Sequence, residues 1–272
     1  MTKTLHDISL DASKYTSGWI SRQPTVKEES ITDWLLDYFD QNSSDISYYQ
    51  FTRHEEAKYS GADWDWWVIL PESKGCFKIR VQAKRLRQGH DHYSDITRSN
   101  KHGFQIDTLL KSSAILNFYP IYANYTLSEG VERCQRTPPT ESLFISSALD
   151  IYNLVFGTPR FKLESTDILK LCIPMPCLFG CPLTSRNGKY RCGITALFQN
   201  YFDDEPDCVE NSESSKSDLD RGYEKEVPYI IELMSNTDNI DLDRESIEIK
   251  YKEQYAGSNA VAIFKISNKH IG

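Results

Sequence analysis

The spacing of apolar side chains predicts a helix followed by three strands in the first third of the chain. From near Val26, apolar residues recur at the i, i+3, i+4, i+7 and i+8 spacing of one buried helical face. That face comprises Ile31, Trp34, Leu35, Tyr38 and Phe39. Residues 46–53 then read as a strand, and apolar runs at 61–70 and 77–86 read as two more, joined by a turn over 71–75.

A second helix and a fourth strand follow a polar, histidine-rich stretch. That stretch, residues 89–103, has no periodicity and predicts a mobile loop. Apolar spacing over 104–115 predicts an amphipathic helix that ends at Asn117, and 119–125 predicts a strand. The order helix, three strands, helix, strand predicts a mixed sheet flanked by helices, a fold of the α/β (α+β) class.

The remainder of the chain carries weaker periodic signals. A short strand is expected at 142–146 and a helix at 148–156, followed much later by three closing strands at 227–234, 247–251 and 260–266. These strands would belong to a C-terminal extension of the sheet.

The pattern divides the chain into three parts. Residues 1–24 lack clear periodicity and predict a loosely packed N-terminal lead-in. Residues 25–127 form the predicted core, and 128–272 form a C-terminal extension. Within that extension, the acidic, serine-rich tract 203–222 predicts a surface loop.

Composition describes an ordinary globular protein. The chain has 272 residues, 39% of them hydrophobic and 12% aromatic, which is enough to bury a substantial core. Its first 30 residues contain no apolar run typical of a signal peptide, and no window is long and apolar enough to span a membrane. Seven cysteines, an odd number, then indicate reduced thiols and a cytoplasmic location.

Charge is unevenly distributed along the chain. The net charge of −8 argues against nucleic-acid binding, but Lys74 to Lys111 contains nine basic and three acidic residues. A positive segment of this kind suits the phosphates of DNA, whereas the alternative is a solvated lysine and arginine face. The predicted nucleic-acid contacts are Arg80, Arg85, Arg87, Arg98 and Lys101.

Candidate chemistry lies on the two strands at 61–70 and 77–86. Asp63 begins the first strand, while Gln82 and Lys84 share one face of the second. Carboxylate and amide oxygens can bind Mg²⁺ or Mn²⁺, and an ammonium group can position a water or stabilise charge on a phosphate. The pattern therefore predicts a metal-dependent site that hydrolyses phosphodiester bonds. We interpret the neighbouring Trp64, Trp66 and Trp67 as packing residues.

These motifs resemble a known nuclease superfamily. Gly61-Ala62-Asp63 followed by Val81-Gln82-Ala83-Lys84 is similar to the PD-(D/E)xK signature, in the Q-x-K variant of Mrr-like restriction endonucleases. The GADWxWW and VQAKRL motifs also look like those of an uncharacterised bacterial family with this fold. The resemblance covers residues 25–127. It implies a restriction-endonuclease-like core in an endonuclease that cuts DNA, in defence against foreign DNA or in DNA processing.

The resemblance also implies a role for each motif residue. Asp63 would bind the metal ion, Gln82 would replace the usual acidic ligand, and Lys84 would be the catalytic lysine. Related enzymes often add a glutamate from the first helix, which corresponds to Glu29 or to its neighbour Glu28.

Because Gln82 stands where related enzymes have a carboxylate, the chain could be an active nuclease or an inactive binding module. Asp65 or Glu56 could supply a compensating carboxylate, and Asp65 is favoured because it shares strand parity with Asp63. Alternatively, the chain is a catalytically inactive module of the same fold that binds nucleic acid or a partner protein, including a second copy of itself.

Two further groups of side chains have ligand chemistry. Four cysteines in the proline-rich middle of the chain could hold a structural zinc ion, although their irregular spacing favours buried reduced thiols. They are Cys172, Cys177, Cys181 and Cys192. Three histidines after the second strand could contact phosphate or lie solvated in the loop. They are His90, His92 and His102.

Overall fold

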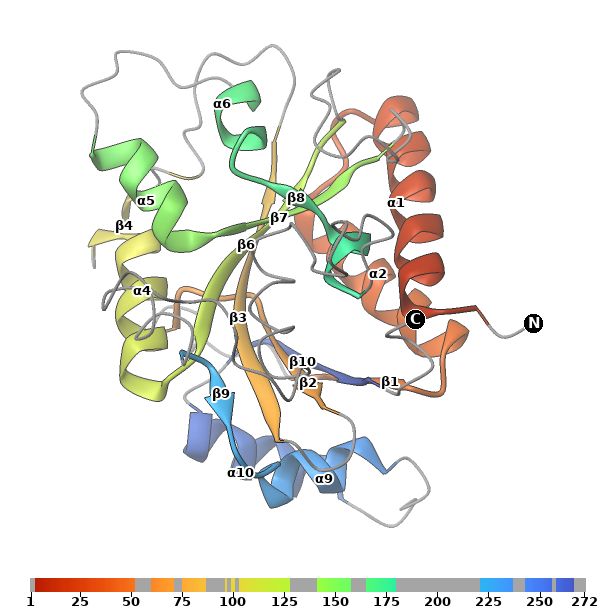
Figure 1. Cartoon of the computed structure of the whole chain (residues 1–272), viewed down its shortest axis with the longest axis vertical. Coiled ribbons are helices and arrows are strands. Elements are labelled where there is room, and N and C mark those ends of the chain that lie inside the picture. Colours follow the sequence, from red (N-terminus) through yellow and green to blue (C-terminus); the bar gives the residue numbers. More distant parts are fainter. Residues whose placement is uncertain are drawn as a thin grey trace, which may run out of the picture.

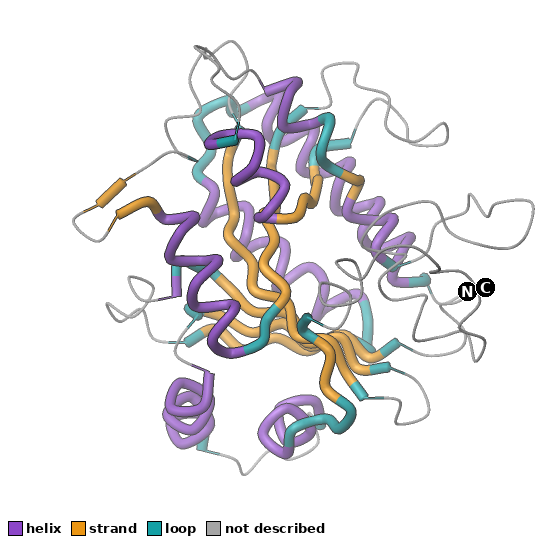
Figure 2. Tube along the Cα trace, turned by 60° about the vertical axis from the view of Figure 1, so that its left-hand side comes forward, coloured by secondary structure: helices purple, strands orange, loops and turns teal. Residues whose placement is uncertain are grey.

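A computed structural model describes most of the chain. The described residues are 3–51, 60–70, 75–86, 96, 99–100, 103–127, 141–157, 165–179, 221–236, 243–255 and 258–266. The predicted loops at 89–103 and 203–222 lie mostly outside them. Within them the chain forms a mixed α/β fold, a twisted sheet with helices against both faces (Figures 1 and 2). This is the fold class that the sequence predicts.

The described elements have the following bounds. The helices are α1 (Leu5–Arg22), α2 (Glu28–Asn42), α4 (Gln105–Leu116), α5 (Ala148–Phe156), α6 (Ser165–Leu169), α9 (Tyr229–Ser235), α10 (Arg244–Tyr255) and the 3₁₀-helix η2 (Met175–Leu178). The strands of the main sheet are β1 (Ile46–Gln50), β2 (Trp64–Ile69), β3 (Cys76–Arg85), β6 (Tyr119–Tyr125), β7 (Leu143–Ser147), β8 (Ile173–Pro174), β9 (Tyr223–Glu224) and β10 (Ala260–Lys265). A separate small pair joins β4 (Ser99–Asn100) to β5 (Gly103–Phe104).

The main sheet mixes parallel and antiparallel pairing. Its order is β1-β10-β2-β3-β6-β7-β8, with β9 paired to one end of β3. Neighbouring strands β2 and β3 run antiparallel, β3 and β6 run parallel, and β6 and β7 run antiparallel. The helices and strands predicted between residues 26 and 156 are therefore confirmed wherever the structure describes them.

The last described strand lies inside the sheet. β10 pairs antiparallel with β1 on one side and parallel with β2 on the other. Its first five residues are buried and apolar, as expected of a strand covered on both faces. The predicted strand at 260–266 is thus confirmed, and it separates two strands that are neighbours along the chain. One sheet therefore contains strands from both sides of residue 127.

Residues 1–24 are not a loosely packed lead-in, which corrects the expectation from sequence. Most of this segment is the 18-residue helix α1, which Thr4 and Asp7 begin with reciprocal capping bonds. Its buried face includes Ile8 and Ala12 but also the small polar residues Ser13 and Thr16. Because three of the seven buried residues of this face are polar, apolar spacing alone does not reveal the helix. The Ser13 hydroxyl accepts hydrogen bonds from the backbone at the start of β7.

Two of the three predicted closing strands are helices. Residues 229–235 form α9, and residues 244–255 form α10. The buried side chains of α10 are Ile247, Tyr251 and Tyr255, which have the i, i+4, i+8 spacing of a helix. Reading the short apolar runs as strands was wrong because it used too short a window to separate the two periods.

Each face of the sheet has its own helical cover (Figure 1). α1, α2 and η2 pack over Trp64, Trp66 and the neighbouring apolar residues of β3 and β6. On the opposite face, α4, α5 and α6 cover one part of the sheet, and α9 and α10 cover the part around Trp67. The tryptophans are fully buried, in agreement with their interpretation as packing residues. Among the described residues, no helix combines the length and apolar character that crossing a bilayer requires.

The packing of α1 can be tested by shortening one buried side chain. Ile8 is fully buried in the core between α1 and the sheet. Ile8→Ala should lower the free energy of unfolding by about 2–5 kcal/mol because it leaves a cavity. Urea unfolding measures this loss. A change below about 0.5 kcal/mol, the range of exposed positions, would mean that α1 is not packed.

Candidate active site

Asp63 stands at the start of β2, where its backbone is bonded to both neighbouring strand segments. Its amide donates to the Val81 carbonyl of β3 at 2.9 Å, and its carbonyl accepts from the amide of Asn259, just before β10, at 3.0 Å. The carboxylate therefore leaves the backbone at a fixed place at the end of the sheet.

The Asp63 carboxylate is held by the segment of β3 that contains the predicted motif. Oδ2 accepts a hydrogen bond from the Ala83 amide at 2.8 Å and a second from the Gln82 side-chain nitrogen. The same Gln82 nitrogen also donates to the Ala83 carbonyl at 3.0 Å. Asp63 and Gln82 are thus brought into direct contact, as the motif predicts.

Lys84 joins this pair through a residue that the sequence analysis missed. The Lys84 ammonium donates to Gln105 Oε1 at 3.0 Å, and Gln105 Nε2 donates to Gln82 Oε1 at 2.6 Å. Gln105 is the first residue of α4. Its only signal in the sequence is its place at the start of the helix after the motif strand, because a glutamine at a helix start otherwise suggests no function.

Gly61 allows α4 to approach the motif strand this closely. Its φ of +68° lies in the left-handed region that favours glycine. A Cβ added there would lie 2.6 Å from the Leu109 amide nitrogen and 2.9 Å from the Gln105 carbonyl oxygen. A side chain at this position would push α4 away and separate Gln105 from Gln82.

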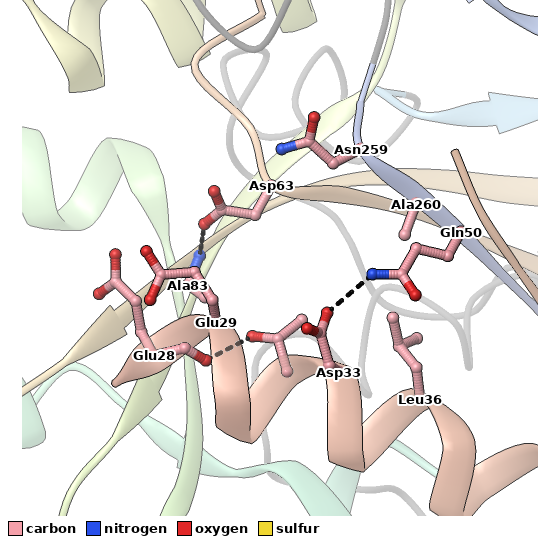
Figure 3. Close-up of a pocket in the computed structure, with 10 residues that line it drawn as sticks. Glu28, Glu29, Asp33, Leu36, Gln50, Asp63, Ala83, Asn259 and Ala260 are labelled. Atoms are coloured by element: carbon pink, nitrogen blue, oxygen red, sulfur yellow. Dashed lines mark hydrogen bonds between the residues drawn. The ribbon is translucent and has the colours of Figure 1, made fainter. Parts of the chain in front are cut away.

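The first two turns of α2 bring further carboxylates to the site. Glu28, Glu29 and Asp33 line a pocket of about 190 Å³ together with Asp63 (Figure 3). Glu28 accepts a hydrogen bond from the Arg85 amide at 3.1 Å, and its other oxygen lies 3.8 Å from the Lys84 ammonium. Both glutamates offered by the resemblance therefore reach the pocket, and it is Glu28 that contacts the lysine.

Burial makes Asp63 a weak acid in this setting. Removal from water raises the pKa of Asp63 to about 7; the Lys84 charge lowers it, and the Glu28 and Glu29 charges raise it further. A cation bound at the carboxylate would favour the ionised form. An added positive charge would therefore stabilise the negative charges of Asp63, Glu28 and Glu29 that lie together here.

The residues present fit a hard cation in part. Asp63 and the α2 carboxylates supply the oxygen ligands that Mg²⁺ prefers. Within the described ranges, however, no three His, Cys, Asp or Glu side chains are grouped closely enough to share one ion. Gln82 turns its nitrogen, not its oxygen, toward Asp63. An ion here would use one or two carboxylates and several waters, which is the common mode for Mg²⁺.

Asp65 is not an accessory ligand, and Arg80 is not a DNA contact. Both side chains are fully buried against α10, where Arg80 Nε donates to Asp65 Oδ1 at 3.0 Å. Tyr251 of α10 donates to Asp65 Oδ2 at 2.9 Å, and the Arg80 guanidinium lies over the Phe118 ring. The shared parity of Asp63 and Asp65 does not place them together because Asp63 precedes the strand and reaches across its end.

Arg85 is also used inside the protein. Its guanidinium donates to the carbonyl oxygens of Leu86 and Tyr125. The remaining predicted positions Arg87, Arg98, Lys101, Glu56, His90, His92 and His102 lie outside the residues whose side chains are described.

Two of the four candidate zinc ligands can be placed. Cys172 and Cys177 are buried, and Cys172 donates to the Ile168 carbonyl at 3.2 Å. Cys181 and Cys192 lie outside the described residues, so the zinc site stays a prediction.

Comparison with known proteins identifies the family. A profile of the "Family of unknown function (DUF6615)" matches residues 2–269, nearly the whole chain. The chain belongs to this family. The family match includes α1, both motif strands and β10, so one family spans the segments that meet in the sheet. No curated protein matches the sequence.

The raised pKa of Asp63 predicts a pH dependence of stability. Because the pKa in the folded protein lies above the ordinary value of 3.8, the folded state binds the proton more tightly than the unfolded chain. This stabilisation is complete below about pH 4 and is lost as the pH rises through about 7. Relative to Asp63→Asn, wild type should lose on the order of 4 kcal/mol between about pH 4 and pH 8.

Urea unfolding of wild type and Asp63→Asn across this pH range measures the difference. Comparison with the variant is needed because burial also raises the pKa of Glu141 to about 7, and this contribution cancels in the difference. A difference that does not change with pH would show that the Asp63 carboxyl ionises normally.

The buried ion pair predicts a large structural effect of Asp65. Asp65→Asn removes the negative charge and leaves the Arg80 guanidinium buried, with both side chains 0% exposed in the native protein. The free energy of unfolding should fall by about 3–5 kcal/mol. Glu253→Gln, an exposed position on the same α10, is the control and should change it by less than about 0.5 kcal/mol. Equal effects of the two substitutions would contradict a structural role for the pair.

Proposed function

We propose that the chain is a metal-dependent nuclease of the PD-(D/E)xK type that hydrolyses phosphodiester bonds in DNA. The observation that carries the proposal is the hydrogen-bonded connection of Asp63, Gln82 and Lys84 beside a pocket that Asp63, Glu28 and Glu29 line. The motif resemblance and the order of the surrounding helices and strands support it. A cytoplasmic role in defence against foreign DNA, or in DNA processing, belongs to the same proposal.

The proposed roles follow from the chemistry of each group. Asp63 and Glu29 or Glu28 would hold Mg²⁺ or Mn²⁺, and Gln82 would add its amide oxygen. When bound, the ion would polarise the scissile phosphate and lower the pKa of an attacking water. Lys84 would hold a proton and a positive charge next to the phosphate, where negative charge develops.

Phosphate contacts would come from fewer residues than the local charge suggests. Arg80 and Arg85 are committed to internal contacts, and Lys78 is paired with Glu224. Lys27, exposed at the N-cap of α2 and next to Glu28 in the sequence, is a further candidate for a phosphate contact. Arg87, Arg98 and Lys101 remain predicted contacts.

The geometry of Gln82 favours a second candidate function. A side chain that donates to Asp63 is not arranged as a metal ligand, and the net charge of −8 does not favour a polyanion. The second candidate is a non-catalytic module of this fold that binds nucleic acid or a partner protein.

Cleavage assays separate the two candidates. Supercoiled plasmid with Mg²⁺ or Mn²⁺ should be cut by wild type, and Asp63→Asn or Lys84→Met should reduce the rate by at least about a hundredfold. Lys250→Met, an exposed lysine of α10 outside the basic segment, is the matched control and should retain the rate.

The pattern of cleavage across the variants decides between the two functions. Cleavage that persists in the Asp63 and Lys84 variants would mean that a different site, or a contaminant, cuts the DNA. Absence of cleavage with every metal ion, together with DNA binding in a mobility-shift assay, would favour the non-catalytic module.

A further inference from the structure

Three hydrogen bonds connect Lys84 to Asp63 through two glutamines. The Lys84 ammonium donates to Gln105, Gln105 donates to Gln82, and Gln82 donates to Asp63. Lys84 and Gln82 are almost completely buried, so water competes little for these bonds. Every bond points in the same direction, from the cationic end to the anionic end.

The direction of this chain is set by its ends. A lysine ammonium can only donate, so Gln105 must present its oxygen to Lys84 and its nitrogen to Gln82. Gln82 must then present its oxygen to Gln105 and its nitrogen to Asp63. An ionised Asp63 can only accept, which requires the same direction. The reversed chain would place a donor against a donor at Lys84, so this direction holds however the oxygen and nitrogen of either amide are assigned.

The Gln82 nitrogen occupies the position that would suit a cation. It contacts two oxygens, Asp63 Oδ2 and the Ala83 carbonyl. Turning the amide over would bring its oxygen against these two, and three oxygens together repel one another unless a positive charge lies among them. The same turn would set the Gln82 nitrogen against the Gln105 nitrogen, leaving both donors without an acceptor.

We infer that Gln105 is a positioning residue that locks the Gln82 amide in the orientation that excludes a metal ion. The inference rests on the proposed function, since it concerns ion binding at the same site. Ion binding through Gln82 and the bond from Gln105 to Gln82 are mutually exclusive. Gln105 therefore lowers the affinity of the site for its ion.

Substitution of Gln105 tests the lock by measuring Mn²⁺ affinity. Gln105→Met keeps the length of the side chain and removes both of its hydrogen bonds, so the Gln82 amide becomes free to turn over. The Mn²⁺ dissociation constant of the full chain, measured by isothermal titration calorimetry, should fall by roughly tenfold. Only binding that is absent in Asp63→Asn is counted, which removes ions bound elsewhere on the acidic chain.

A second background separates the lock from a general effect of the substitution. Gln82→Glu has two equivalent oxygens and needs no turn to face an ion. Gln105→Met should therefore change the Mn²⁺ affinity of Gln82→Glu by no more than about twofold. If Gln105→Met folds poorly by circular dichroism, Gln105→Glu replaces it. Its carboxylate accepts from both Lys84 and Gln82, and should tighten Mn²⁺ binding in the native background more than in Gln82→Glu, which has no amide to turn over.

The outcomes distinguish this inference from the proposed function. If Gln105→Met tightens Mn²⁺ binding in the native background but not in the Gln82→Glu background, the lock is supported, whether or not DNA is cut. Unchanged or weaker binding, or an equal gain in both backgrounds, overturns the lock and leaves the nuclease proposal standing. Absence of Asp63-dependent Mn²⁺ binding in every variant overturns the lock and the metal-dependent function together.

Discussion

Pairing between β2 and β3 brings the residues of the candidate site together. In this antiparallel register Trp64 lies opposite Val81, so the residue before β2 meets the segment from Val81 to Lys84. The Asp63 amide bonds to β3 through the backbone, and its carboxylate takes the next available amide, that of Ala83. A shift of one residue in this register would turn Gln82 and Lys84 to the other face of the sheet. The geometry of the site is therefore a property of the sheet and not of a flexible loop.

The same two strands place two aspartates in opposite chemical situations. Asp65 is fully compensated, because Arg80 and Tyr251 together satisfy both of its oxygens. Asp63 is partly exposed, and its bonding partners are a neutral amide group and a backbone amide, with the Lys84 charge acting at longer range. A compensated buried charge serves the packing of α10, whereas an under-compensated one is available for chemistry.

Stability and the candidate chemistry oppose each other at the first turn of α2. Glu28 and Glu29 suit the positive end of the helix dipole, yet they also bring negative charge toward Asp63. Lys84 offsets part of this charge and is itself held by Gln105 and Glu28. The amide chain from Lys84 to Asp63 spreads the compensation over two neutral side chains, so the buried ammonium and the partly exposed carboxylate are connected without direct contact.

Local pattern determined the elements that carry the motif. The five-residue apolar face of α2, the two strands and their turn, and the helix ending at Asn117 all follow from spacing over short windows, and the structure contains each of these helices and strands. Asp63, Gln82 and Lys84 can be identified for the same reason, because their relation depends on strand parity and on pairing between strands that are neighbours in sequence. α1 escapes this pattern because its buried face includes Ser13 and Thr16, which carry no apolar signal.

Tertiary contacts decided the strand order and the bonding partners of the charged residues, which the spacing of apolar residues in the sequence does not predict. β10 enters between β1 and β2 from nearly 200 residues further along the chain, and no local pattern states which strands it will separate. Arg80, Arg85 and Asp65, which the sequence predicts to be functional, are buried and bonded to other residues of the protein. A sequence does not show which of its charged residues will be paired in the interior. Gln105 joined the site only because Gly61 lets α4 approach the motif strand. The sequence alone thus determined which residues are candidates for the chemistry, and the packing of distant segments decided which partners each of them has.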